Sequence, residues 1–403
     1  MIDRTLATLS GLVWPSRFSP VSQQSYERAV ETFFGTGRVF AFWKGRIALY
    51  TILKAMGIGP GDEVIVPGYT CVMVPGPVLY VGAKPVYADI EPNCYSVRPD
   101  DVARLINPRT KAILVQHTYG LPGAVLEIGQ IAKQHNIALI EDCCHTFGGR
   151  LEGQLLGTFG RAAFFSGQWN KPFSTGLGGL ALVHDDKLAD RLSAEQARYP
   201  APSRKAAFML ACQLLLYDLI VFPSTSAKVT RLFRWMTKKG LVIGSSNKAE
   251  FDVVMPPDYA LAAVPVQCRR GRAQVIGIQD NIAHRRRITT RYFEELPKAG
   301  YTVPRLPAGA EVPILRFPLR VANKTEALAK AADYGVEVGS WFECPLHPIE
   351  TDQAAFGYRD GDCPVAEKAA REVINLPTHQ RVPERDIERT LDFVRAVCRP
   401  AQP

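Results

Sequence analysis

The sequence predicts an α/β protein with a mostly parallel sheet, and three observations support this fold class. Short apolar runs alternate with amphipathic stretches from residue 39 to about residue 200, separated by turns rich in Gly and Pro. Such alternation implies right-handed crossovers between parallel strands. One buried apolar run, residues 137–142, ends in the acid Asp142. The composition agrees, because 47% hydrophobic and 22% charged residues are typical of an ordinary globular protein.

The expected elements follow one another closely in the first half of the chain. We expect strands at residues 39–43, 63–67, 85–89, 112–117 and 137–142. We expect helices at residues 22–34, 47–56, 99–105 and 124–135. Ligands of such sheets gather at the carboxyl ends of the strands, where Tyr69, His117, Tyr119 and Asp142 are expected.

Five segments are expected along the chain. They are a lead-in at 1–38, a large domain at 39–200, a basic and apolar helical insertion at 201–252, a long bridging helix within 253–300, and a smaller α+β domain at 301–403. The bridging helix is expected at 260–297, interrupted by Pro265. In the last segment we expect strands at 314–321 and 336–339 and helices at 325–334, 365–373 and 384–397.

A lysine between an apolar run and a glycine-rich turn is the first candidate for chemistry. Lys171 follows Phe164-Phe165 and precedes Gly176-Leu177-Gly178-Gly179. Most lysines are solvated, and the glycines by themselves indicate only a tight turn. The apolar surroundings favour a buried lysine with a lowered pKa. A lysine that forms a Schiff base and a carboxylate such as Asp142 that keeps a pyridine nitrogen protonated are what a pyridoxal phosphate enzyme requires.

A candidate phosphate cradle lies near the start of the large domain. The expected strand at 39–43, the turn Lys44-Gly45-Arg46 and the helix at 47–56 would point free backbone N–H groups at an anion. Arg46 would add a charge-assisted contact. Such strand-glycine-helix corners are common in α/β proteins, so this motif alone has little specificity.

The positive charge of the chain is concentrated in one segment. Ser203 to Lys248 contains eight basic residues and one acid, Asp218, and so accounts for +7 of the net charge of +9. It includes a 17-residue apolar run at 206–222, shorter than the roughly 20 residues that a spanning helix needs. The following stretch, 228–239, is amphipathic on a helical wheel. Two interpretations stay open: a helical hairpin packed on the enzyme or on a second subunit, or attachment to an anionic membrane surface. A nucleic-acid partner is not expected.

The cysteines and the N-terminus favour a reducing compartment. The nine cysteines are irregularly spaced, without a C-x-x-C pair, and Cys143-Cys144 is unsuited to an ordinary structural disulfide. No export signal is apparent at Met1. We therefore expect a cytoplasmic protein, with peripheral contact to the inner face of the cytoplasmic membrane as an extension, and no metal site.

Several motifs in a fixed order resemble the DegT/DnrJ/StrS family of sugar aminotransferases. The matching stretches are Gly57–Pro67, Val81–Val86, Ile140–Asp142, Ser166–Lys171, Gly176–Gly179, Cys344–His347 and Gly361–Lys368. The resemblance covers about residues 38–195 and 255–397. It implies the aspartate-aminotransferase type of fold (fold type I), pyridoxal 5′-phosphate as cofactor, and a homodimer with shared active sites.

The resemblance also implies roles for the central residues. Lys171 would form the Schiff base, and Asp142 would pair with the pyridine nitrogen. Cys144 would pack against the ring, and His145 would lie near the phenolic oxygen. Lys171, Asp142 and His145 are therefore the expected catalytic residues.

The residues expected to bind the phosphate of the cofactor match the family less well. Ser166 and the turn Gly45-Arg46 would hold the phosphate, although the family has Gly-Thr or Gly-Ser where this chain has Gly45-Arg46. The residue after Thr70 is usually an aromatic that stacks on the ring, and here it is Cys71. Cys71 is nevertheless assigned to the cofactor site.

The substrate side also departs from the family. Tyr69 and Trp169 are candidates to replace the missing aromatic and, with His347, are assigned to the substrate. The neighbour-derived Asn-Tyr-Arg element is replaced by Val253–Pro257.

These features together predict an aminotransferase for a keto sugar. It would move an amino group from an amino acid, typically glutamate, to a nucleotide-linked or lipid-linked keto sugar in the synthesis of cell-surface glycans such as lipopolysaccharide, or of antibiotic sugars. One alternative is a dehydratase of the same family, in which histidine replaces the lysine, so Lys171 argues against it. The other is a non-catalytic regulatory homologue, which the retention of Lys171 and Asp142 disfavours.

Overall fold

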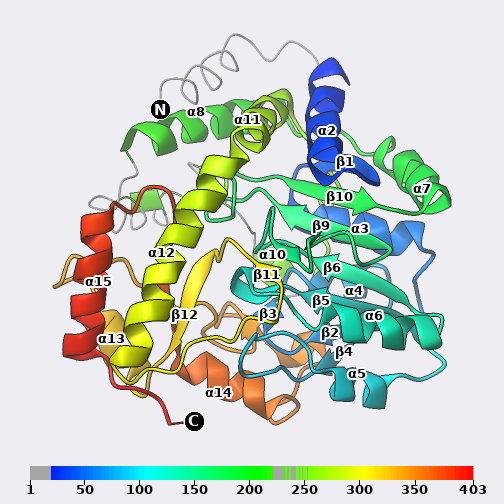
Figure 1. The fold of residues 1–403 in the computed structure, drawn as a ribbon. Helices are drawn as coiled ribbons and strands as arrows, with labels where there is room; N and C mark the ends of the chain where they lie inside the picture. Colours follow the sequence, from blue (N-terminus) through cyan, green and yellow to red (C-terminus); the bar gives the residue numbers. More distant parts are fainter. Residues whose placement is uncertain are drawn as a thin grey trace.

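A mostly parallel sheet lies at the centre of the computed structural model, which describes residues 20–220, 229, 232–233, 236, 242–244, 246, 248–251 and 253–402 (Figure 1). Among these residues, seven strands form the sheet in the spatial order β1 (Arg38–Phe42), β10 (Gly179–Val183), β9 (Ala162–Ser166), β6 (Ala138–Asp142), β5 (Thr110–Gln116), β2 (Glu63–Pro67) and β4 (Lys84–Ala88). Strand β10 runs antiparallel to both neighbours, and the other pairings are parallel. The expected α/β class is confirmed.

The strand directions bring several chain segments to one edge of the sheet. Because β5, β6 and β9 are parallel, Gln116, Asp142 and Ser166 end their strands at the same edge. Strand β1 ends there too, since Phe42 pairs with Gly179 and Gly179 pairs with Ser166.

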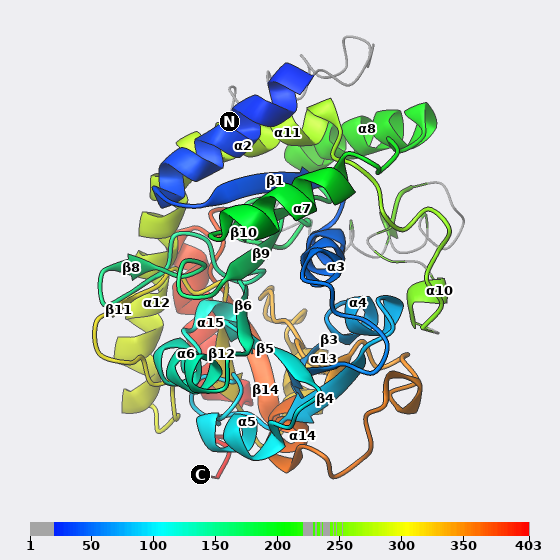
Figure 2. The same cartoon turned by 90° about the vertical axis from the view of Figure 1, so that its right-hand side faces the viewer.

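Helices cover both faces of this sheet (Figures 1 and 2). In the first half of the chain they are α2 (Pro20–Phe34), α3 (Gly45–Ala55), α4 (Pro75–Tyr80), α5 (Pro99–Leu105), α6 (Val125–Gln134) and α7 (Asp186–Gln196). Helix α3 packs on β1, β9 and β10, whereas α6 packs on β5 and β6. Every residue of β2, β9 and β10 is buried, as expected for strands covered on both faces.

The second half of the chain contributes further helices and short sheets. The helices are α8 (Arg204–Ile220), α10 (Lys248–Phe251), α11 (Pro265–Ile276), α12 (Ile278–Lys298), α13 (Lys324–Lys330), α14 (Pro364–Glu372) and α15 (Glu384–Val397). Strand β12 (Arg316–Arg320) pairs antiparallel with β14 (Val373–Pro377), and β11 (Ala310–Glu311) joins β7 (Arg150–Leu151) and β8 (Gln154–Leu155). The parallel pair β3 (Thr70–Cys71) and β13 (Leu346–His347) brings the segment around residue 345 to the functional edge of the sheet.

Three local expectations differ from the structure. The helix expected at 260–297 is divided into α11 and α12, which meet at Gly277. The strand expected at 336–339 is reduced to a single bridge between Gly339 and Asn375. Residues 373–377, which directly follow α14, form β14 because all five are buried against the core and pair with β12. The division into five segments stays a prediction.

Helix α8 is apolar around its whole circumference but is only partly covered. Leu210 and Leu214 are buried, whereas Phe208, Leu216 and Leu219 are each at least half exposed. A helix that is apolar on every side is usually buried, so α8 presents an unusual surface. Among the described helices, none is long and apolar enough to cross a lipid bilayer. The expected amphipathic stretch 228–239 lies largely outside the described residues.

Candidate active site

A cavity lies at the edge where the strands end. Eight residues that the sequence assigned to the cofactor line it: Gly45, Arg46, Cys71, Asp142, Cys144, His145, Ser166 and Lys171. It is also lined by Lys44, Thr70, Met73, Val74, Gln116, Phe164, Gln168, Leu177, Gly178 and Phe342. The structure thus brings together segments that are up to about 300 residues apart in the sequence.

Lys171 lies in the loop between β9 and β10 and reaches into this cavity. Its backbone N–H donates to the carbonyl of Gln168 at 3.0 Å, which closes a turn. Its Nζ lies 4.8 Å from the centre of the Trp341 ring. Burial lowers the pKa of Lys171, although the nearby Cys144, Asp142 and Cys71 oppose this shift. A lysine with a lowered pKa is more often an uncharged amine, which is the form that attacks a carbonyl carbon.

Asp142 provides a buried carboxylate on the same cavity. It is the last residue of β6, and its Oδ1 accepts the backbone N–H of Cys144 at 2.9 Å. Burial raises the pKa of Asp142, and the hydrogen bond from Cys144 and the charge of Lys171 oppose this effect. A buried carboxylate costs free energy unless a cation or a strong donor faces it. A protonated pyridine nitrogen would be such a partner, so the cavity fits pyridoxal phosphate.

His145 is held as a neutral ring with a defined tautomer. Its Nδ1 accepts the backbone N–H of Tyr119 at 3.1 Å, so the ring proton is on Nε2. Burial, together with the charges of Lys171 and Arg316, keeps the pKa of His145 well below its usual value. The ring stacks on Trp341 with centroids 5.3 Å apart and an interplanar angle of 15°. His145 can therefore act as a neutral hydrogen-bond donor.

The anion-binding end of the cavity is the N-terminus of α3. Gly45 and Arg46 are its first two residues, so their N–H groups have no partner within the helix. A side chain at Gly179 would collide with the Gly45 backbone at 2.4 Å, so β10 and α3 approach closely. A phosphate would meet free N–H groups, the helix dipole and Ser166.

Glu250 is an unexpected acid at this end of the cavity. It is buried in α10, and its carboxylate pairs with Arg46 at 2.5 Å and approaches Lys44 Nζ at 4.0 Å. Burial and the charge of Arg46 lower the pKa of Lys44 to about 8. Arg46 thus has a protein partner, which the sequence did not indicate because the two residues are 204 positions apart.

The three residues assigned to the substrate do not line the cavity. Tyr69 is fully buried and its hydroxyl is hydrogen-bonded to that of Tyr119 at 2.9 Å. The ring of Trp169 packs on Tyr217 of α8 at 5.0 Å. His347 lies against Phe342, with ring centroids 5.5 Å apart. The cavity has Cys71 where the family stacks an aromatic ring. The role of all three as substrate contacts stays a prediction.

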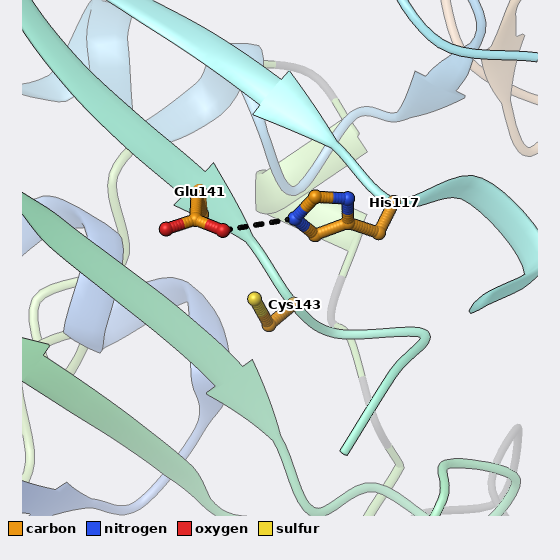
Figure 3. A group of neighbouring side chains, drawn as sticks. All are labelled: His117, Glu141 and Cys143. Carbon is orange, nitrogen blue, oxygen red and sulfur yellow. Dashed lines mark hydrogen bonds and ion pairs between the residues drawn. The ribbon is translucent and has the colours of Figure 1, made fainter. Parts of the chain in front are cut away.

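A second cluster, His117, Glu141 and Cys143, lies at the carboxyl ends of β5 and β6 (Figure 3). His117 Nδ1 accepts the N–H of Gly123 at 3.1 Å, so Nε2 carries the proton and faces Glu141 Oε2 at 3.1 Å. Glu141 also accepts three backbone N–H groups at 2.7 Å, from Gly157, Phe159 and Gly160. The ring nitrogens of His117 and the carboxylate of Glu141 are engaged in hydrogen bonds, so the pair is explained as a buried polar network.

Comparison with known proteins identifies similar chains. The model of the DegT/DnrJ/EryC1/StrS aminotransferase family matches residues 19–203 and 246–395. A GDP-perosamine synthase from Caulobacter vibrioides is 28% identical over 91% of this chain and 87% of its own length. A UDP-N-acetyl-3-dehydro-alpha-D-glucosamine 3-aminotransferase from Acidithiobacillus ferrooxidans is 28% identical over 87% of this chain and 82% of its own.

A solved structure with the same fold comes from Brucella abortus. It is described as a DegT DnrJ EryC1 StrS aminotransferase and matches with a TM-score of 0.75 and 24% identity, over 98% of this chain and 95% of its own. The family model leaves residues 204–245 unmatched, and these include α8 and most of the basic segment.

Proposed function

The chain belongs to the DegT/DnrJ/EryC1/StrS aminotransferase family, and on this premise we propose that it transfers an amino group from an amino acid, typically glutamate, to a nucleotide-linked keto sugar. The observation that carries the proposal is one cavity lined by both a buried lysine and a buried strand-end carboxylate. The protein is a pyridoxal phosphate-dependent sugar aminotransferase in its general class. The choice of glutamate as the donor and of a nucleotide-linked sugar as the acceptor is the proposal.

The residues of the cavity have separate tasks in this reaction. Pyridoxal phosphate, when bound, supplies an electron sink for charge that develops on the substrate carbon. Asp142 holds a proton at the pyridine nitrogen, which keeps that sink effective. Lys171 would accept a proton from the substrate carbon and return it to the cofactor's C4′ carbon. His145 would donate a hydrogen bond from Nε2 to the phenolic oxygen of the cofactor and thereby orient the cofactor ring.

The experiment that tests the acceptor class uses a panel of nucleotide-linked keto sugars. Protein loaded with pyridoxamine phosphate is mixed with each sugar, and the product is examined by mass spectrometry for exchange of a ketone for an amine. We expect at least one nucleotide-linked ketone to be converted and free monosaccharide ketones to be poor acceptors. Conversion of simple 2-oxo acids alone would contradict a sugar acceptor.

We also propose a homodimer with active sites completed by the neighbouring subunit. The family resemblance supports this proposal. Sedimentation is expected to give twice the chain mass of 44.5 kDa. A fully active monomer would contradict the proposal.

Attachment to an anionic membrane surface is the proposed role of the basic segment. The exposed apolar residues of α8 and the net charge of +7 of the segment are two features that favour binding at an anionic interface. Each Lys or Arg near an anionic surface contributes about 1 kcal/mol, so a few of them would suffice for reversible binding. Such attachment would suit a lipid-linked sugar or a glycan assembled at the membrane.

We expect the protein to float with anionic vesicles at low salt and to be released by high salt. Changing Arg231, Arg234 and Lys238 to Glu is expected to abolish flotation, because it reverses the local charge. The matched control changes Arg385, Arg389 and Arg395 of α15 to Glu, with the same change in net charge. A wild-type protein that stays wholly in the soluble fraction at low salt would rule out attachment and leave packing on the enzyme or on a second subunit as the alternative.

A further inference from the structure

Arg316 is a cation without a protein partner beside the active site. It is the first residue of β12, and its side chain is partly exposed. Its guanidinium carbon lies 4.6 Å from the centre of the Trp341 ring. Among the described residues, none forms a hydrogen bond or an ion pair with Arg316, whereas Arg320 at the other end of the strand pairs with Glu372 at 2.7 Å. A half-buried guanidinium with free donors is costly to maintain unless it binds an anion.

The surroundings of Arg316 leave positive charge uncompensated. The acid that acts on it is Glu337, which already pairs with His379 at 3.0 Å. Burial lowers the pKa of the nearby Arg285 to about 10, and the positive charge of Arg316 adds to this effect. Arg285 donates to the oxygens of Asn281, Leu315 and Thr378, which are all uncharged. This side of the cavity therefore attracts anions.

Trp341 connects Arg316 to the reacting groups. Lys171 Nζ lies 4.8 Å from the same ring, so the distance between the two cations cannot exceed the sum of their distances from it. His145 stacks on this ring as well. The backbone of Trp341 is held by Asn375. The backbone N–H of Trp341 donates to Asn375 Oδ1 at 2.8 Å, and its carbonyl accepts from the side-chain amide of Asn375 at 3.0 Å. These bonds fix the backbone of Trp341, and its indole ring lies within 4.8 Å of both Lys171 Nζ and the guanidinium carbon of Arg316.

We propose that Arg316, stacked on Trp341, binds the carboxylate of the amino-acid donor while the amino group of that donor lies at Lys171. The inference rests on the proposed function and adds to it the residue that selects the donor. A guanidinium presents parallel N–H groups that match both oxygens of a carboxylate, and stacking on an indole keeps its donor edge free. An anionic group on the sugar acceptor would satisfy the same chemistry, so the test must separate the two half-reactions.

The test follows each half-reaction by the absorbance of the bound cofactor in single-turnover experiments. For Arg316→Gln we expect the apparent Kd for L-glutamate to rise roughly 10- to 100-fold, because a hydrogen-bonded charge pair is lost. Arg316→Lys should retain part of the affinity. The reverse half-reaction, from pyridoxamine-loaded protein to a keto sugar, should change less than about threefold. Arg320→Gln is the control, since it removes an arginine of the same strand whose guanidinium already pairs with Glu372 and does not contact Trp341 in the structure.

A binding measurement makes the subsite testable without turnover. Glutarate lacks an amino group and cannot react, so its binding to cofactor-loaded protein can be followed by calorimetry. We expect binding to the wild type and to Arg320→Gln, and loss of binding in Arg316→Gln. Equal glutarate binding by all three proteins, or a defect confined to the acceptor half-reaction, would overturn the assignment. A wild type that binds glutarate but is not converted by any amino acid would refute the proposed function and leave the subsite in place.

Discussion

Replacing Asp142 by asparagine is expected to leave the cofactor bound while lowering turnover by roughly 10²- to 10³-fold, as is typical when one electrostatic group that stabilises a transition state is removed. The amide has nearly the same shape as the carboxylate and can still accept the N–H of Cys144. It cannot hold a proton at the pyridine nitrogen, because it carries no charge. The expected defect is therefore in kcat and not in cofactor content.

The measurement combines cofactor content with steady-state kinetics. Cofactor is quantified after denaturation, and kcat is compared with the wild type and with Asp185→Asn, a control in which asparagine still caps α7 at the surface. A kcat within about threefold of the wild type, at full cofactor occupancy, would refute the role of Asp142.

Replacing Lys171 by alanine is expected to have a still larger effect. It removes both the covalent attachment of the cofactor and the group that moves the proton, so turnover should fall by about 10⁴-fold or more. The protein should also lose the visible absorbance of a lysine-bound cofactor. Reduction with borohydride followed by peptide mass analysis should place the cofactor on Lys171 in the wild type.

Lys187→Ala is the matched control, because Lys187 is an exposed lysine of α7 outside the cavity. It should retain both absorbance and turnover. Borohydride labelling of a different lysine, or substantial turnover by Lys171→Ala, would show that another residue performs this role.

The sequence predicted the part of the site that consists of local motifs. Asp142, Cys144 and His145 follow one strand in direct succession, so a correct strand assignment places all three at the same edge. Lys171 lies five residues after the end of the neighbouring strand β9, and the family motif Ser166–Lys171 identified it. The parallel sheet could be predicted as well, because buried strands alternating with helices allow few other arrangements.

The remaining residues are brought together only by the tertiary fold. Glu250 reaches Arg46, and Arg316 and Trp341 reach Lys171, across separations that no local pattern records. Trp341 lies three residues before Cys344, the start of the motif Cys344–His347, and this is the signal that could have identified it. Strand β14 was missed because its pairing with β12 and its burial decide its structure, rather than its local propensity.

The central claim is that Lys171 and Asp142 catalyse the transfer of an amino group. Following ¹⁵N from a labelled amino acid to the cofactor tests this claim most directly. Protein loaded with pyridoxal phosphate is mixed with ¹⁵N-labelled amino acids in a single turnover, and the extracted cofactor is examined by mass spectrometry. The account predicts ¹⁵N-labelled pyridoxamine phosphate from the wild type, much slower labelling in Asp142→Asn and none in Lys171→Ala. A wild type with full cofactor content that acquires no label from any amino acid would contradict it.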